Sequence, residues 1–238
     1  GSNFEMIMHK IWHDFFKWKI NEMPGYFSDA VEIIENEFFE FEWHRVYDFI
    51  EFIIINKPDR IRNLEKFPSV CNLILEEENA GYRIIDGKFT PIASESEIQT
   101  IEEIIQNSDS FHGVRTHIRT ALKFLSDRKS PDYRNSIKES ISAVESICQV
   151  LTGDDKATLG DALNKLENHF NLHGALKAGF KSLYGYTSDQ DGIRHAILKE
   201  QDISFSDAKY MLVSCSAFAN YLIGKVAELE IKIPDQNT

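Results

Sequence analysis

The sequence predicts a mainly α-helical protein: an N-terminal helical domain with a small β-hairpin, followed by an all-helical bundle. Three observations lead to this fold class. Apolar residues recur at spacings of three and four along most of the chain, which is the period of a half-buried helix. A strand-like pattern occurs once, at about residues 82–92. The 238 residues, 42% of them hydrophobic, are enough to build the cores of two small domains.

The first domain is expected to span residues 3–106 and to begin with four amphipathic helices. The first would run from Phe4 to Ile20, and the second would follow a cap at Ser28-Asp29 and continue to about Phe41. The next two cover His44–Asn56 and Phe67–Asn79. The three tryptophans of the chain are expected to fill the core of this half: Trp12, Trp18 and Trp43.

A β-hairpin is expected after these helices, because Asp86-Gly87 separates two short runs of apolar and polar residues. This pair is a strong signal for a type I′ turn, in which glycine tolerates the positive φ. A further helix with a capping pattern at Ser94–Glu97 would run to about Gln106. The polar segment 107–110 is the expected domain boundary.

The second domain, residues 111–232, is expected to be helical throughout. Pro131 suits a first helical turn, and Gly153 lies where a long helix would end. A polar loop would occupy residues 185–192, and Ser204 would cap the last helix. The expected helices are His112–Asp127, Tyr133–Leu151, Lys156–Asn168, Gly174–Tyr184 and a final helix from Ser204 to about Glu230.

The net charge of −12 lies entirely in residues 1–110. As a whole-chain value it would argue against nucleic acid, because Lys and Arg must neutralise the phosphates. Residues 111–138, however, have a net charge of +5, with only Asp127 and Asp132 opposing seven basic side chains. RNA therefore remains an expected partner of the second domain. The acidic half could mask this basic segment or bind a basic protein partner.

Neither a metal nor a cofactor is expected, because the sequence contains no zinc, P-loop, dinucleotide-binding or nucleophile-elbow motif. The three cysteines are far apart, which favours reduced, buried thiols of a cytoplasmic protein. No membrane contact is expected, since no apolar run reaches 18 residues. Gly1-Ser2 is typical of a residual tag, and no secretory signal follows it.

The segment 188–195 is the most suggestive of chemistry, because it combines Asp189, Asp191, Arg194 and His195. Histidine can move a proton near neutral pH, and arginine can bind a phosphate and stabilise charge on it. This pair suits cleavage of RNA, whose 2′-hydroxyl is an internal nucleophile. The alternative is a loop whose shape is fixed by an ion pair between Arg194 and one of the aspartates.

Two further groups could contact nucleic acid. At the expected start of one helix, Arg134, Asn135 and Lys138 accompany Glu139, and a helix N-terminus can bind phosphate. The alternative is ordinary helix capping. The spacing of four between Arg115, Arg119 and Lys123 places these cations on one helix face, which could equally be a solvated surface.

Several long segments resemble the AbiJ family of bacterial abortive-infection proteins. In the second half these are residues 131–167, 183–198 (LYGYTSDQDGIRHAIL) and 204–223 (SFSDAKYMLVSCSAFANYLI). In the first half, YDFIEFI and GYRIIDGKFTPI look like the N-terminal domain found in one branch of the family. The resemblance covers nearly the whole chain.

This resemblance implies a HEPN-like C-terminal bundle that forms a homodimer and cleaves RNA without a metal. It assigns catalysis to Arg194 and His195, completed by Asp191 and by Glu139 from a neighbouring helix. HEPN nucleases usually separate the Arg and His by several residues, whereas here they are adjacent. The alternative function is therefore a catalytically inactive HEPN-like module for interaction, sensing or RNA binding.

Overall fold

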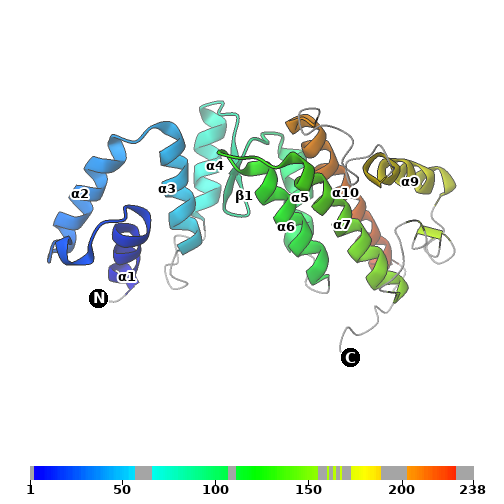
Figure 1. Cartoon of the computed structure of the whole chain (residues 1–238), viewed down its shortest axis with the longest axis horizontal. Helices are drawn as coiled ribbons and strands as arrows, with labels where there is room; N and C mark the ends of the chain where they lie inside the picture. The colour runs from blue at the N-terminus through cyan, green and yellow to red at the C-terminus, as the bar shows by residue number, and fades with distance from the viewer. Residues whose placement is uncertain are drawn as a thin grey trace. The chain divides into compact units, whose positions relative to one another are not determined.

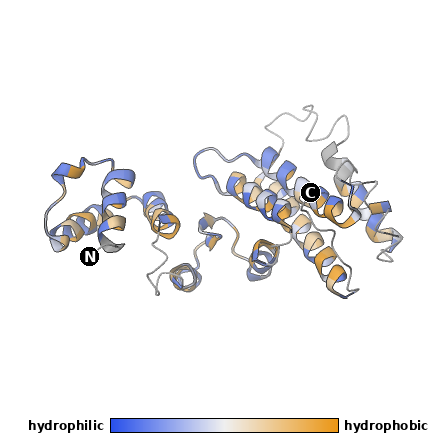
Figure 2. Ribbon diagram, turned by 90° about the horizontal axis from the view of Figure 1, so that it is seen from below, coloured by the Kyte–Doolittle hydropathy of each residue, from blue (hydrophilic) through white to orange (hydrophobic). Residues whose placement is uncertain are grey.

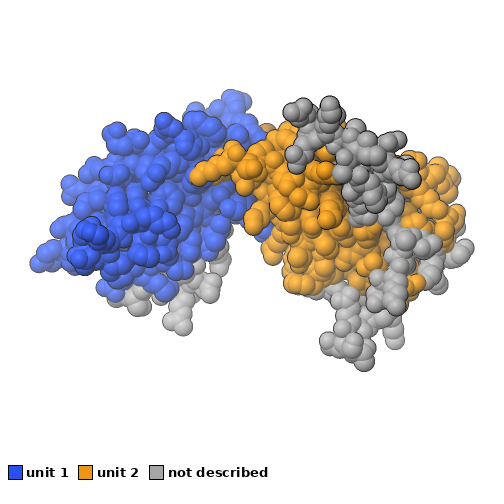
Figure 3. Space-filling model, in the orientation of Figure 1, with its two compact units in different colours: residues 1–91 blue, residues 92–238 orange. Residues whose placement is uncertain are grey.

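The computed structural model describes residues 3–56, 66–106, 111–154, 160, 163–164, 167, 173–188 and 203–228. The chain forms two compact units, unit 1 (residues 1–91) and unit 2 (residues 92–238), which are coloured separately in Figure 3. Within the described residues, both units are built from helices, and a single two-stranded hairpin is the only sheet. The predicted mainly α fold with a small hairpin is therefore confirmed.

In its described residues, 3–56 and 66–91, unit 1 contains four α-helices and two short irregular helices. Its bounds are α1 (Asn3–Lys10), the π-helix η1 (Ile11–Phe15), the 3₁₀-helix η2 (Ile20–Glu22), α2 (Phe27–Phe39), α3 (Trp43–Asn56) and α4 (Phe67–Glu77). The predicted second, third and fourth helices correspond to α2, α3 and α4. The predicted cap at Ser28-Asp29 is wrong: Tyr26 precedes α2 without a side-chain cap, and the Ser28 hydroxyl donates to the Asp29 carboxylate.

The predicted single helix from Phe4 to Ile20 is also wrong, because it breaks after the π-helix. Lys17 adopts a positive φ of 64°, and the Trp12 Nε1–H donates to the Lys19 carbonyl at 3.0 Å. Phe16 and Trp18 stack with ring centroids 4.2 Å apart. Burying these rings in one cluster outweighs continuing the helix. Trp12 is buried and Trp18 packs against the cluster, but Trp43 is 59% exposed, so its prediction as a core residue is wrong.

The predicted hairpin is confirmed as β1 (Arg83–Ile85) and β2 (Lys88–Thr90), with Asp86 and Gly87 at φ 48° and 79°. Polar side chains cover its backbone on both edges. The Asn72 side chain exchanges two hydrogen bonds with Ile84 of β1, at 2.7 and 2.9 Å. The Phe89 N–H donates to buried Glu51 at 2.7 Å. These bonds satisfy backbone groups that a two-stranded sheet leaves unpaired.

Unit 2 is a helical bundle in which α10 packs against α7 and α5, and α6 packs against α7 (Figure 1). In Figure 2 the helices of this unit carry hydrophobic and hydrophilic residues on different sides. The bounds are α5 (Glu95–Gln106), α6 (His112–Ser126), α7 (Tyr133–Thr152), α9 (Gly174–Ser188) and α10 (Phe205–Glu228). Helix α9 continues four residues past the predicted end at Tyr184, so the predicted loop does not begin at Gly185.

Helix α5 packs as part of unit 2. Its isoleucines 98, 101, 104 and 105 are all buried, and Ile101 and Ile104 are completely buried. The α10 side chain of Asn220 donates to the Thr100 carbonyl at 2.9 Å, and Lys209 pairs with Glu97 at 3.0 Å. The packing thus divides the chain after Pro91, whereas the predicted boundary at 107–110 lies outside the described residues. The predicted helix over 156–168 lies largely outside them as well.

The ends of the long helices follow local sequence signals. Asp132 caps α7 through its carboxylate, and Gly153 ends that helix at a φ of 65°. Ser204 and Asp207 form a reciprocal capping box at the start of α10. Hydrogen bonds from Ser204 hold the pKa of Asp207 below its usual value. None of the described helices is both long and apolar enough to cross a bilayer.

The three cysteines carry free thiols, as predicted from their spacing. Burial raises the pKa of Cys148 and of Cys215 to about 12, which keeps both thiols protonated and unreactive at neutral pH. Cys71 is half-buried, and burial raises its pKa as well. These residues therefore behave as core side chains of the two units.

Candidate functional site

The predicted residues that the structure describes lie on α6 and α7, which pack as an antiparallel pair. Gly113 of α6 sits so close to Ser146 of α7 that an added Cβ would lie 2.4 Å from the serine Oγ. At the other end, the Asp132 N–H donates to the Phe124 carbonyl at 3.1 Å. We call the line of contact between these two ends the α6–α7 seam. A larger residue at position 113 would therefore force the Ser146 hydroxyl to move.

An imidazole and a carboxylate meet across the middle of the seam. His117 Nδ1 lies 2.7 Å from Glu139 Oε2, with the two side chains 36% and 22% exposed. An ionised carboxylate only accepts hydrogen bonds, so the Nδ1–H of His117 is the donor. The other ring nitrogen, Nε2, has no hydrogen-bond partner among the described residues. Glu139, a predicted catalytic residue, is thus bonded to a histidine that the sequence did not single out.

The start of α7 is closed by its own cap. The backbone N–H of Asn135 donates to Asp132 Oδ1 at 2.9 Å, and its side-chain Nδ2–H donates to Oδ2 at 2.6 Å. A carboxylate therefore already occupies this helix N-terminus, which is the capping alternative considered for the Arg134-Asn135 segment. A direct contact of Asn135 with nucleic acid remains a prediction.

The predicted cations flank the seam instead of lining it. At 100° per residue, Arg115, Arg119 and Lys123 lie roughly 100–180° around α6 from the side that faces α7. Arg119 and Lys123 are exposed, and Arg115 is half-buried. On α7, exposed Lys138 and half-buried Arg134 are turned about 100–140° away from Glu139. The structure thus places the cations on the outer sides of one helix pair.

The remaining predicted catalytic residues, Asp191, Arg194 and His195, lie outside the described residues. Their arrangement stays a prediction. His117 was missed because it was read only as part of a helix. A signal was present: by helical period, His117 borders the apolar face formed by Val114, Ile118 and Ala121. A polar side chain at such an edge needs a partner from the neighbouring helix.

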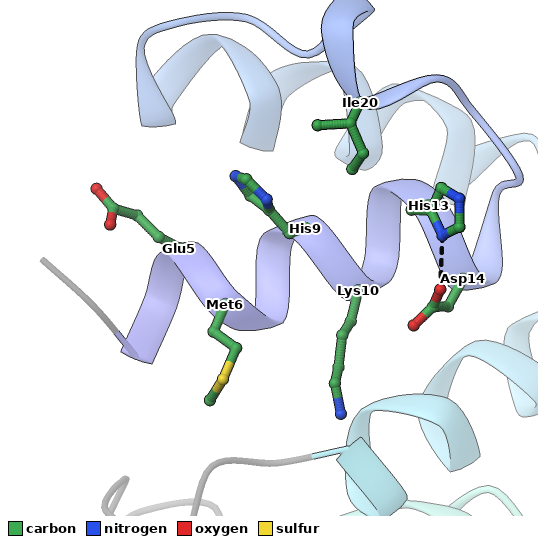
Figure 4. A pocket seen from close by; sticks show the side chains of 7 residues that line it. All are labelled: Glu5, Met6, His9, Lys10, His13, Asp14 and Ile20. Atoms are coloured by element: carbon green, nitrogen blue, oxygen red, sulfur yellow. Dashed lines mark hydrogen bonds and ion pairs between the residues drawn. The ribbon is translucent and has the colours of Figure 1, made fainter.

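A second candidate site is an open pocket of about 530 Å³ beside α1 in unit 1. Figure 4 shows His9 on the same side of α1 as Ile20, whereas Met6 and Lys10 extend from the other side of the helix. A hydrogen bond from His13 lowers the pKa of the exposed Asp14 carboxyl. Among the described residues, no group of three or more His, Cys, Asp or Glu side chains could hold a metal ion. The pocket is open, and its His13 and Asp14 side chains are 63% and 50% exposed, so the less exposed pair at the seam is the stronger candidate.

The comparisons with known proteins concern the N-terminal part. Residues 3–107 match the family model described as AbiJ N-terminal domain 4, which is less than half of the chain. No curated protein and no solved structure matches the chain. The family match supports an AbiJ-type N-terminal domain and suggests a defence protein of the abortive-infection type. The matched range includes α5, which packs in unit 2.

Proposed function

We propose that this chain is an antiphage defence protein whose HEPN-like C-terminal unit binds RNA and cleaves it without a metal ion. The observation that carries the defence role is the match of residues 3–107 to AbiJ N-terminal domain 4. The RNA substrate is inferred from the basic segment 111–138, which lies on α6 and α7 of unit 2. Phosphate binding by cations supplies the sequence-independent part of RNA affinity.

The proposed cleavage is a transesterification within the RNA. His195 would take the proton of the 2′-hydroxyl, the 2′-oxygen would attack the phosphorus, and Arg194 would stabilise the charge on the phosphorane. The bond to the 5′-oxygen would break, and that oxygen would take a proton from water. The products are a 2′,3′-cyclic phosphate and a 5′-hydroxyl. Arg134 and Lys138 would hold the backbone.

The same proposal includes a homodimer formed through the C-terminal helical unit. A second copy would supply the polar groups that adjacent Arg194 and His195 cannot provide from a single helix face, since neighbouring helical residues point about 100° apart. The acidic N-terminal half would mask the basic segment or bind a basic protein. Residues 1–91 contain 17 acidic and 10 basic side chains, which supports an electrostatic role for this unit.

An RNA-degradation assay in EDTA tests the proposal by comparing the wild-type chain with His195→Ala. Cleavage by the wild type and its loss in the variant is the expected result. His112→Ala is the matched control, because it removes an exposed histidine from α6 and should leave cleavage unchanged. Equal cleavage by wild type and His195→Ala would overturn the mechanism. RNA binding without any cleavage would favour the catalytically inactive module.

A further inference from the structure

The bond between His117 and Glu139 fixes which nitrogen of the imidazole carries the proton. Because the carboxylate can only accept, Nδ1 carries a proton; when the ring is neutral, Nε2 is an acceptor. The seam therefore holds a ring nitrogen at a half-exposed position that can accept a hydrogen bond in the neutral ring. Nε2 has no hydrogen-bond partner among the described residues.

We propose that His117 Nε2 accepts a hydrogen bond from a ribose 2′-hydroxyl, so that the His117–Glu139 pair selects RNA over DNA. The 2′-hydroxyl is the group by which a protein can tell the two nucleic acids apart. In this proposal His117 contacts the substrate, and Glu139 is a positioning residue that acts through His117. The inference rests on the proposed binding of RNA by unit 2, and it assigns Glu139 a role other than direct catalysis.

In this proposal, exposed cations on α6 and α7 bind the phosphates of the strand whose ribose His117 contacts. Arg119 and Lys123 on α6 and Lys138 on α7 are exposed on the two helices that carry the pair. Phosphate contacts made by such cations position a strand, but they are the same for RNA and DNA. These cations lie on the outer sides of the helix pair, so a strand bound to them would cross the seam to bring a ribose to His117 Nε2.

A purely structural role for the pair leads to a different expectation. A hydrogen bond that only ties α6 to α7 would affect the stability of unit 2, and any loss of binding would be equal for RNA and DNA. A 2′-hydroxyl contact instead changes the ratio of the two affinities. That ratio is therefore the quantity to measure.

The test uses fluorescence anisotropy of the full-length chain with short labelled oligouridine and its 2′-deoxyuridine counterpart, at low salt and in EDTA. All proteins carry His195→Ala, so that the RNA stays intact during the titration. One hydrogen bond predicts an RNA preference of about three- to tenfold. His117→Ala should abolish this preference and leave DNA affinity within about twofold. His117→Phe fills the same volume without an acceptor and replaces the alanine variant if that variant does not fold.

The control His112→Ala should retain the RNA preference, because His112 lies on the solvent-facing side of α6. Equal affinity for both oligonucleotides in the reference protein, or a preference that survives loss of the His117 ring, would overturn the inference while leaving the proposed function intact. Absence of binding to either oligonucleotide would overturn the proposed function, and the inference with it.

Discussion

Replacing Ile101 by alanine should destabilise unit 2 and leave unit 1 unchanged. Ile101 lies at the centre of α5 and is completely buried, with Ile98, Ile104 and Ile105 around it. Truncating a fully buried isoleucine to alanine costs about 2–5 kcal/mol, because transfer energy is lost and a cavity remains. With a urea dependence of about 2 kcal/mol per molar, the unfolding midpoint of unit 2 should fall by about 1–2.5 M.

The distribution of tryptophan makes the two units separately observable. All three tryptophans of the chain, Trp12, Trp18 and Trp43, lie in unit 1. Fluorescence excited selectively at tryptophan therefore follows unit 1 alone, whereas far-ultraviolet circular dichroism follows the helices of both units. In urea titrations, Ile101→Ala should shift the dichroism transition of unit 2 and leave the tryptophan transition in place.

Two control variants make this result specific. Gln99→Ala changes an exposed residue of α5 and should move neither transition by more than about 0.5 kcal/mol. Ile34→Ala removes a core residue of the cluster that contains Trp12, and it should move the tryptophan transition instead. A shift of the tryptophan transition in Ile101→Ala equal to the dichroism shift would refute the assignment of α5 to unit 2. No shift in either signal would refute its burial.

Two other predictions follow from the charges of the chain. Hydrogen bonds from Ser204 lower the pKa of Asp207, so the stability that its carboxylate contributes is present above the ordinary aspartate pKa and is lost as pH falls through the lowered value. Asp207→Ala should lower the free energy of unfolding, measured by circular dichroism, by about 1 kcal/mol at pH 7 and leave it unchanged at the acid end of the titration. A loss of stability that does not depend on pH would contradict this prediction. Removing residues 1–91, which retains α5, should strengthen RNA binding at low salt, whereas unchanged or weaker binding by the folded remainder would contradict masking.

Elements with strong local signals could be predicted from the sequence. Asp86-Gly87 forms the expected turn because only a few residue types tolerate positive φ at both turn positions. The cap of α10 is also where it was predicted, since Ser204 and Asp207 satisfy each other's backbone groups within one turn. Such features depend on residues close together in the chain, which a sequence pattern reports directly.

Features decided by distant contacts could not be predicted. The first helix ends early because Trp12 donates to the Lys19 carbonyl and Phe16 stacks on Trp18, and no local pattern shows those contacts. The assignment of α5 to unit 2 likewise depends on packing against α10, more than a hundred residues away. The expected boundary at 107–110 lies outside the described residues and stays a prediction.

The candidate site shows the same limit. The resemblance to HEPN-like domains implied a role for Glu139, but its partner His117 lies 22 residues earlier on another helix. Helical period places His117 at the edge of an apolar face, and only the packing of α6 on α7 shows which carboxylate it meets. The proton on Nδ1 of the ring follows from that contact alone.

The most direct test of the account is the chemistry of the RNA ends that the purified protein leaves in EDTA. A HEPN-like transesterification predicts 2′,3′-cyclic phosphate and 5′-hydroxyl ends from the wild-type chain, and no such ends from His195→Ala. Ends bearing 3′-hydroxyl and 5′-phosphate would contradict the mechanism, because water and not the 2′-oxygen would then be the nucleophile. Intact RNA after incubation with the folded wild-type chain would contradict nuclease function itself.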